Sequence, residues 1–256
     1  MTNNIVGSID LVEVLFTLFW LFFAVLVLYL HRESKREGYP LLSSSGDGTV
    51  VSGFPSEPAL KTYKLAHGGE VTVPRPVDEY ELKAETAGVY TGAPIVPTGD
   101  PLVDGIGPAA WANRQDTPDL TYHGEPRIVP MRSQPSFHVD ERDPDPRGME
   151  VVSADDLVVG TITDVWIDIP EPMIVYVEMA FDASVATGSI VLPFDFAVIN
   201  KAAGQLKVDA LMASQFANAP RLKNPDTITL LEEDKVCAYF GGGALLAEES
   251  RAEPLL

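Results

Sequence analysis

Residues 11–30, LVEVLFTLFWLFFAVLVLYL, decide the architecture of the chain because they form an almost unbroken apolar run. Glu13, near its start, carries the only charge in the run. As a helix the run would extend over roughly 30 Å, which matches the hydrocarbon thickness of a bilayer. A buried helix of a soluble core is rarely this apolar on every face. The run therefore predicts a single transmembrane helix, which we place at residues 11–31.

The flanks of this run give it a direction and distinguish it from a cleaved secretory signal. Such a signal begins with a basic segment and ends at a cleavage site of small residues. Here no Lys or Arg precedes residue 31, whereas Arg32, Lys35 and Arg36 follow directly. The positive-inside rule then predicts that residues 1–10 lie outside and that the rest of the chain is cytoplasmic. We expect the three basic side chains to face lipid headgroups.

Composition excludes several classes of protein. The chain has 256 residues and a formal net charge of −19, so it lacks the basic surface that nucleic-acid binding requires. A single cysteine, Cys237, excludes an internal disulfide, and we interpret it as a small buried apolar residue. The four histidines are scattered, without an HxxxH or HxH pair. We therefore predict no metal site and no bound cofactor.

Residues 32–146 form a proline-rich segment that contains 15 of the 21 prolines. Within it, residues 62–66 and 70–74 are separated by His-Gly-Gly and predict a β-hairpin. Apolar side chains such as Phe54, Ile106 and Trp111 are too frequent for a disordered linker. We expect this extended segment to lie on the surface of a partner protein and to become buried there.

The pattern changes to short strands at residues 147–228, where Gly, Asp, Ser and Asn turns separate runs such as MIVYVEMAF. This spacing predicts a mostly-β cytoplasmic domain, a small barrel or sandwich. Residues 229–256 are expected to form a C-terminal helix and a tail, with acidic residues in the first turn of the helix. Gly241, Gly242 and Gly243 weaken that helix or allow close backbone packing.

One stretch of the β region, TDVWIDIPEPM at residues 163–173, ends in an acidic turn. Its first six residues alternate in the period-2 pattern of a strand, and Pro170 and Pro172 then end the strand on either side of Glu171. Taken alone, Asp168 and Glu171 are interpreted as a solvated turn. A glycosidase-like acid pair is disfavoured because such carboxylates come from separate elements that flank a cleft. With no GxSxG motif or phosphate-binding loop, the residues point to no active site, so we predict that the chain is not an enzyme.

Several segments together resemble the H subunit of purple-bacterial photosynthetic reaction centres. The resemblance follows the order of that family across nearly the whole chain, except residues 1–10 and 43–60. The segments are RESKREGYPL (32–41), KTYKLAHGGEVTVP (61–74), PTGDPLVDGIGPAAW (97–111), RIVPMR (127–132), DPRGMEVV (145–152), TDVWIDIPE (163–171), SQFANAPRL (214–222) and LLEEDKVCAYFGGG (230–243).

The resemblance implies a fold, a membrane and partners. The β domain would be a PRC-barrel, and the single-pass chain would lie in the bacterial inner (intracytoplasmic) membrane with a periplasmic N-terminus. The family's role is to cap and stabilise the L and M subunits on the cytoplasmic side and to conduct protons toward the secondary quinone. The chain itself would bind no pigment; bacteriochlorophyll, bacteriopheophytin, quinones and non-haem iron belong to the partner subunits. Antenna polypeptides and membrane lipids are further candidate contacts.

The resemblance also assigns proton-transfer roles to individual positions. His123 matches a proton-entry histidine of the family, and Asp168 and Glu171 match its relay acids. Where some members have a second histidine, this chain has Glu125, which keeps a titratable group but removes a two-imidazole metal site. Where some have an arginine, this chain has Val175, so we expect Glu171 to lack a neighbouring cation and to hold its proton more tightly.

Two other classes of function compete with this one. A membrane-tethered PRC-barrel adaptor for an unrelated protein partner would share the helix and the β domain. An anchored hydrolase has no convergent catalytic residues in its favour. Copurification with pigment-containing subunits distinguishes the H-subunit function from the adaptor function.

Overall fold

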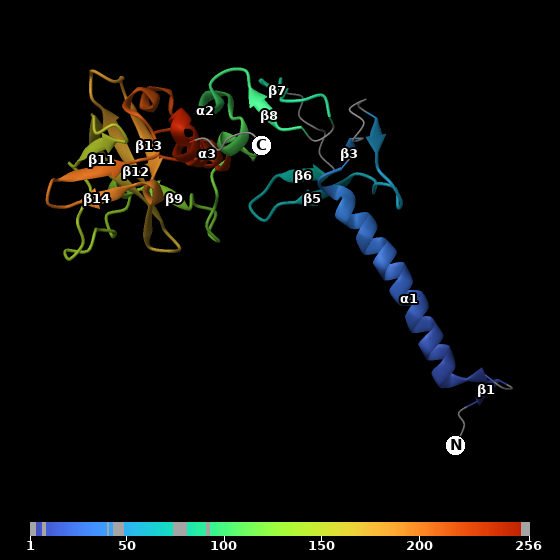
Figure 1. Ribbon diagram of the computed structural model, residues 1–256. Coiled ribbons are helices and arrows are strands. Elements are labelled where there is room, and N and C mark those ends of the chain that lie inside the picture. The colour runs from blue at the N-terminus through green and yellow to red at the C-terminus, as the bar shows by residue number, and fades with distance from the viewer. Residues whose placement is uncertain are drawn as a thin grey trace. The chain divides into compact units, whose positions relative to one another are not determined.

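The computed structural model describes residues 4–6, 9–39, 41–42, 49–73, 81–90 and 93–251 (Figure 1). The chain divides into two compact units. The N-terminal unit comprises residues 1–81 and 89–93, and the C-terminal unit comprises residues 82–88 and 94–256. The predicted tail beyond residue 251 and the predicted strand end at residue 74 lie outside the described residues.

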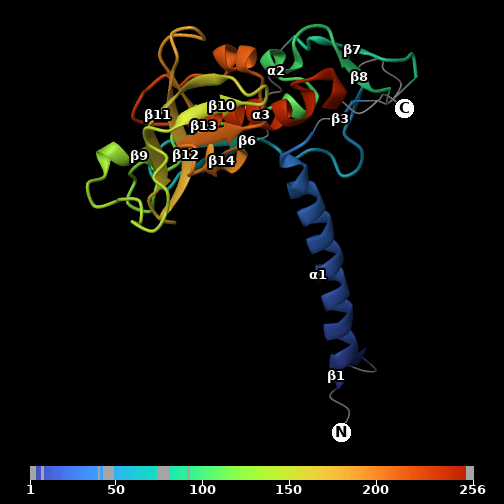
Figure 2. The ribbon, with the colours of Figure 1, turned by 60° about the vertical axis from the view of Figure 1, so that its left-hand side comes forward.

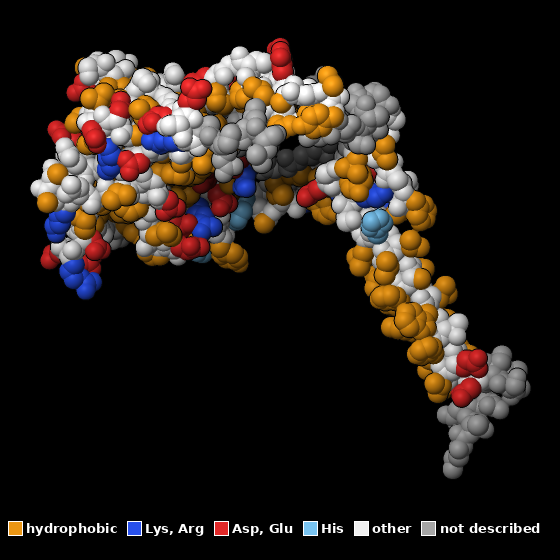
Figure 3. All heavy atoms as spheres, viewed as in Figure 1, with side chains coloured by type: hydrophobic (Ala, Val, Ile, Leu, Met, Phe, Trp, Pro, Cys, Tyr) orange, Lys and Arg blue, Asp and Glu red, His pale blue; other side chains and the backbone are white. Residues whose placement is uncertain are grey.

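Helix α1, Leu11–Glu33, is the apolar segment that the sequence predicts. Asp10 caps its N-terminus, where the carboxylate accepts a hydrogen bond from the Val12 N–H at 3.1 Å. None of its residues is buried within the chain, and Figure 3 shows hydrophobic side chains along its whole length. By length and composition it is the one described helix able to cross a membrane. An apolar helix without a covering protein surface is stable in lipid because its backbone groups are satisfied internally.

The basic cluster after α1 is engaged by the chain itself, contrary to the expectation that it faces lipid. Lys35 is only 3 % exposed. Its ammonium donates to the carbonyl oxygens of Ser52 and Pro55 and lies 5.1 Å from the centre of the Tyr39 ring. Arg36 binds Glu33 and the Ala59 carbonyl oxygen, which leaves Arg32 as the exposed cation of the three. The cause is geometric: the extended chain after the helix returns past its last turn and offers carbonyl acceptors there.

The strands described in the N-terminal unit pair into two-stranded antiparallel sheets. The hairpin predicted around His-Gly-Gly is confirmed as β5 and β6, with Thr62 opposite Thr72. Both strands leave most of their side chains exposed. The strands of this unit are β1 (Asn4–Val6), β2 (Ile9–Asp10), β3 (Leu41–Leu42), β4 (Val50–Val51), β5 (Lys61–Lys64) and β6 (Glu70–Val73).

The C-terminal unit is built on one seven-stranded sheet, which confirms the mostly-β prediction. Its strand order is β13-β12-β11-β10-β15-β14, and β9 pairs with the far end of β11. The long hairpin of β11 and β12 forms its centre (Figures 1 and 2). The strands are β9 (Ile128–Pro130), β10 (Glu150–Ser153), β11 (Val158–Asp168), β12 (Met173–Phe181), β13 (Ser189–Pro193), β14 (Val198–Asn200) and β15 (Gln205–Val208). A separate pair, β7 (Ala84–Thr86) and β8 (Ile95–Pro97), belongs to the same unit.

Strand β11 departs from the one-sided burial that its alternation predicts. Residues 164–168 are all buried, including Asp164, Trp166 and Asp168 on the face expected to meet solvent. The reason lies in β9, which extends the sheet beside this end of β11, with Pro130 opposite Trp166. The arginines on either side of β9, Arg127 and Arg132, bind Asp168 and Asp164. This strand pairing joins positions about 40 residues apart, so local sequence spacing does not reveal it.

The segment before the barrel also buries apolar side chains against its own chain. Helix α2, Pro101–Asp104, and the 3₁₀ turn at Gly107–Ala109 pack on the C-terminal helix α3, Leu230–Leu246. The expectation that a partner covers Ile106 is therefore wrong, since Ile106 is buried within the C-terminal unit. Phe54 is highly exposed, as the same expectation requires, whereas Trp111 is partly covered.

Helix α3 confirms the predicted C-terminal helix, including its acidic start. Thr229 and Glu232 form a capping box, in which each side chain accepts a hydrogen bond from the other's backbone N–H. Its glycines serve close packing: a Cβ on Gly242 would lie 2.5 Å from the Ala109 Cβ. Cys237 is exposed on this helix, which corrects the prediction that it is buried. Figure 2 shows α3 beside the strands of the barrel.

Candidate functional site: an arginine-linked acidic turn

The turn between β11 and β12 carries both predicted relay acids. Strand β11 ends at Asp168 and β12 begins at Met173, so the two prolines fall in the turn, where their missing N–H groups cost no ladder bond. The Glu171 N–H donates to the Asp168 carboxylate at 3.1 Å. The Ile169 N–H donates to the Arg127 carbonyl oxygen at 3.0 Å. These bonds fix the turn against the segment that leads into β9.

Arg127 connects the two carboxylates. Its Nε donates to Asp168 at 2.7 Å and its Nη2 to Glu171 at 2.8 Å. The Asp168 side chain is 8 % exposed and that of Glu171 is 66 % exposed. The hydrogen bond that Arg127 donates to Asp168, followed by the charges of Asp168 and Glu171, raises the pKa of the Arg127 guanidinium above its usual range. The turn thus holds one buried and one exposed carboxylate on a single permanent cation.

This geometry corrects two expectations about the turn. Asp168 is not part of a solvated turn, because it is buried, pairs with Ile128 of β9 and binds Arg127. Glu171 does not lack a cation, although Val175 is apolar and packs against the core. Arg127 reaches it from a different element, 44 residues earlier in the chain. The expectation that Glu171 holds its proton more tightly assumed that no cation lies beside it, and Arg127 removes that assumption.

His123 and Glu125 lie on an exposed loop that leads into Arg127. An isolated bridge between Leu120 and Pro126 closes the loop. Within it, the Thr121 N–H donates to the Glu125 carbonyl oxygen at 2.7 Å, and the His123 ring contacts the Tyr122 ring edge-on at 5.5 Å. Both predicted residues are exposed, and within the described chain neither side chain bonds directly to Asp168 or Glu171. The structure thus brings two of the four predicted residues together and places the other two just before their shared arginine.

Three acidic or phenolic groups near this turn were not predicted from the sequence. Asp119, at the start of the loop, lies 3.8 Å from the Arg127 guanidinium. Glu233, in the first turn of α3, accepts a hydrogen bond from the buried Tyr176 hydroxyl at 3.3 Å. Burial raises the pKa of Glu233, and the charge of Asp119 adds to the effect, while the Tyr176 hydrogen bond and the arginines Arg114 and Arg127 oppose it. In the sequence, Glu233 resembles any acidic residue in the first turn of a helix, so only its burial in the structure identifies it as part of the site.

The Tyr176 hydroxyl also lies 3.5 Å from the Cys237 sulfur. Burial raises the pKa of Tyr176 far above its ordinary value. The Tyr176 hydroxyl therefore stays protonated near pH 7 and donates its hydrogen bond to Glu233.

A second arginine cluster on the same sheet is structural. Arg132 binds the buried Asp164 at 3.1 Å, as well as Glu178 and Asp226, and donates to the Pro225 carbonyl oxygen. Asp164 in turn accepts the Arg132 and Val165 N–H groups. These contacts tie the segment after β9 to the sheet. In the described parts of the chain, no three His, Cys, Asp or Glu side chains form a group that could hold a metal ion.

Comparison with known families agrees with this architecture. Residues 138–213 match the PRC-barrel domain, which covers the strands from β10 to β15. A membrane helix followed by such a barrel defines a membrane-anchored PRC-barrel protein. Residues 3–133, half of the chain, match the model of the photosynthetic reaction centre H-chain N-terminal region. The chain belongs to the photosynthetic reaction centre H-chain family, and that membership associates it with the reaction centre complex.

Proposed function

We propose that the chain caps the L and M subunits of a reaction centre on the cytoplasmic side and conducts protons toward their secondary quinone. It is an accessory subunit, not an enzyme, and binds no pigment of its own. Its N-terminus is periplasmic and its C-terminal unit is cytoplasmic, as the cations after α1 indicate. The proposal rests mainly on one observation: Arg127 joins the buried Asp168 to the exposed Glu171 at one turn.

The four predicted residues divide the proton-transfer role between surface and interior. His123 and Glu125 are exposed at the loop, where their side chains are accessible to solvent and form the entry point of the route. Glu171, also exposed, receives a proton at its carboxylate, and Asp168 holds the buried end of the route. Arg127 positions both carboxylates but does not pass a proton on, because a guanidinium does not lose its proton in proteins. The secondary quinone of the partner subunits takes up two electrons and two protons.

Exposed apolar residues of the N-terminal unit support the capping role. Phe54 is 83 % exposed and Leu60 is 72 % exposed, on an extended segment with little burial of its own. A chain of this kind is stabilised by a partner surface that removes such side chains from water. We propose that the L and M subunits provide that surface.

Two measurements test this proposal. Full-length tagged chain, extracted from a photosynthetic bacterial membrane in mild detergent, is expected to copurify with bacteriochlorophyll-containing subunits. Recovery as a stable, pigment-free protein would instead support the adaptor alternative. In the complex, Asp168→Asn with Glu171→Gln is expected to slow the second, proton-coupled electron transfer to the quinone by at least roughly tenfold.

The matched control for the double variant is Glu150→Gln. Glu150 is an exposed carboxylate opposite Thr161, at the other end of β11 from Asp168. This variant is expected to leave the flash-induced kinetics unchanged. If the double variant also behaves like wild type between about pH 6 and pH 9, the relay assignment is wrong, although membership of the complex stands.

A further inference from the structure

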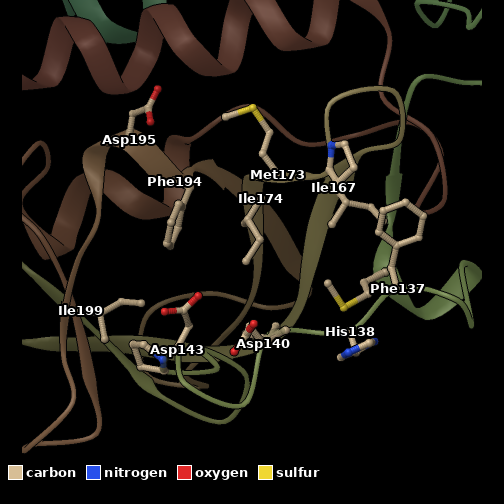
Figure 4. Close-up of a pocket in the computed structure, with 14 residues that line it drawn as sticks. Phe137, His138, Asp140, Asp143, Ile167, Met173, Ile174, Phe194, Asp195 and Ile199 are labelled. Atoms are coloured by element: carbon tan, nitrogen blue, oxygen red, sulfur yellow. The ribbon is translucent and has the colours of Figure 1, made fainter.

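One pocket of the C-terminal unit lies at one end of the barrel and has an apolar floor. Its volume is about 590 Å³, within the range of ligand-binding pockets. Ile167 and Ile174, from the central hairpin, and Phe194 form its floor (Figure 4). Phe137, from the segment after β9, forms one wall. Such a surface favours an apolar occupant, since filling it removes apolar area from water on both sides.

The sheet is open at this pocket. Strands β13 and β14 are the two ends of the strand order, so they do not pair with each other. The short link between them carries Phe194 and Asp195, and β14 contributes Ile199 to the opposite wall. The pocket therefore belongs to the open mouth of the barrel.

The rim of the pocket is acidic. Asp140, Asp143 and Asp195 line it together with His138, and no Lys or Arg does so in the part of the chain described. The Arg142 guanidinium holds Asp140 with two hydrogen bonds of 2.9 Å and lowers its pKa to about 2. Among the described residues, Asp143 and Asp195 have no Lys or Arg within ion-pair distance. A carboxylate or phosphate ligand would be repelled here, whereas a Lys or Arg would find two unpaired carboxylates.

The pocket is continuous with the acidic turn. Pro172 and Met173 line it and directly follow Glu171. Under the proposed function, the face that bears this turn is directed at the partner subunits. Met173 is exposed, and its flexible thioether adapts to a partner's apolar surface.

We propose that this pocket binds a segment of a partner reaction-centre subunit in which an apolar side chain stands next to a Lys or Arg. The apolar side chain occupies the floor at Ile167, Ile174 and Phe194. The basic side chain binds one of the two unpaired carboxylates of the rim, Asp143 or Asp195. This inference rests on the proposed function, because it takes the occupant from the complex that the chain joins.

The test places a photo-crosslinking amino acid, p-benzoylphenylalanine, at Met173 in the full-length chain and illuminates the pigment-containing complex. The expected result is a crosslink to one partner polypeptide, mapped by mass spectrometry to an apolar residue within a few positions of a Lys or Arg. The same probe at Leu157, an exposed apolar residue beside the opposite end of β11, gives no such crosslink.

Charge variants at the rim make the test specific. With the probe at Met173, Asp143→Lys and Asp195→Lys together are expected to lower the yield of the crosslink by roughly tenfold. Asp143→Glu with Asp195→Glu, which keeps the charges, retains it. The inference is overturned by a crosslink to a segment without basic residues, to lipid or a small molecule, to the chain itself, or by none. Pigment in the same preparation reports complex formation, so these outcomes leave the proposed function intact.

Discussion

At the scale of single residues, Arg127 determines the chemistry of the acidic turn. Asp168 is buried beside the apolar core, where an ionised carboxylate without a partner would be strongly unfavourable. Arg127 supplies the partner and uses a second nitrogen to hold Glu171 in place. One cation shared by a buried and an exposed carboxylate leaves the outer group open to solvent while the inner group stays fixed. This asymmetry is what a proton route from surface to interior requires.

Glu233 gives a pH-dependent prediction. Burial raises its pKa in the folded chain, so the folded state binds a proton more tightly than the unfolded state. The neutral carboxyl costs nothing below the unfolded pKa, but stability is lost as pH rises through the folded pKa. Glu233→Gln is therefore expected to stabilise the full chain by a few tenths of a kcal/mol at about pH 8 and by nothing at about pH 4. The small size reflects solvent screening of a half-buried group.

Thermal unfolding of the detergent-solubilised chain at both pH values measures this difference. Glu249→Gln, at an exposed glutamate just after α3, is the control and should change neither value. A loss of stability in Glu233→Gln at about pH 8 would show that Arg114 and Arg127 favour the ionised form more than burial disfavours it.

The sequence predicted these residues unevenly, for a physical reason. Prolines and strand alternation locate the turn that carries Asp168 and Glu171, whereas their relay role follows only from the resemblance to the H-subunit family. The sequence assigns no role to Arg127, since that role depends on β9 pairing with β11. Glu233 carried no local mark either, because its burial depends on Tyr176, 57 positions earlier. Local spacing reveals where a strand ends; it does not reveal which distant side chain covers that end.

At the scale of elements, the glycines of α3 allow the helix to pack closely against the backbone of neighbouring segments. The sequence left open whether Gly241, Gly242 and Gly243 weaken the helix or allow close packing. The helix continues through all three, and Gly242 and Gly243 are buried. Gly242 approaches the backbone at Ala109, and Gly243 approaches Ala210. The cost in helix propensity is thus offset by contacts that only a glycine permits.

Substitution of two adjacent glycines separates these effects. A Cβ on Gly242 would lie 2.5 Å from the Ala109 Cβ and 2.8 Å from its Cα, so the 3₁₀ turn would have to move. Gly242→Ala is expected to lower the free energy of unfolding by about 1–3 kcal/mol. At Gly241 the nearest atom, Phe196 Cζ, lies 3.7 Å away, so Gly241→Ala is expected to raise it by up to about 1 kcal/mol. Denaturant unfolding of the full chain decides; equal effects of both variants would contradict the packing argument.

At the scale of the whole molecule, the two units differ in how they satisfy their apolar surface. The C-terminal unit has a core of its own, centred on residues such as Trp166, Phe216 and Phe240. The N-terminal unit combines an uncovered apolar helix with short hairpins whose side chains are mostly exposed. Both were predictable in outline, since an apolar run and alternating strands are local patterns. The internal burial of Ile106 was not, because it depends on how α3 packs.

This difference predicts that substitutions on the exposed segment of the N-terminal unit weaken association with partner subunits without lowering the stability of the chain. Phe54→Glu with Leu60→Glu places two charges on the exposed segment of the N-terminal unit, outside the barrel core. If partner subunits cover these side chains, the yield of pigment-containing complex after detergent purification should fall by roughly tenfold or more in the double variant. The thermal unfolding of the chain alone should not change, because neither side chain is buried within it. Leu157→Glu, at an exposed position of the C-terminal unit, should leave both readouts at the wild-type level. Full pigment retention by the double variant would mean that this segment faces water in the complex.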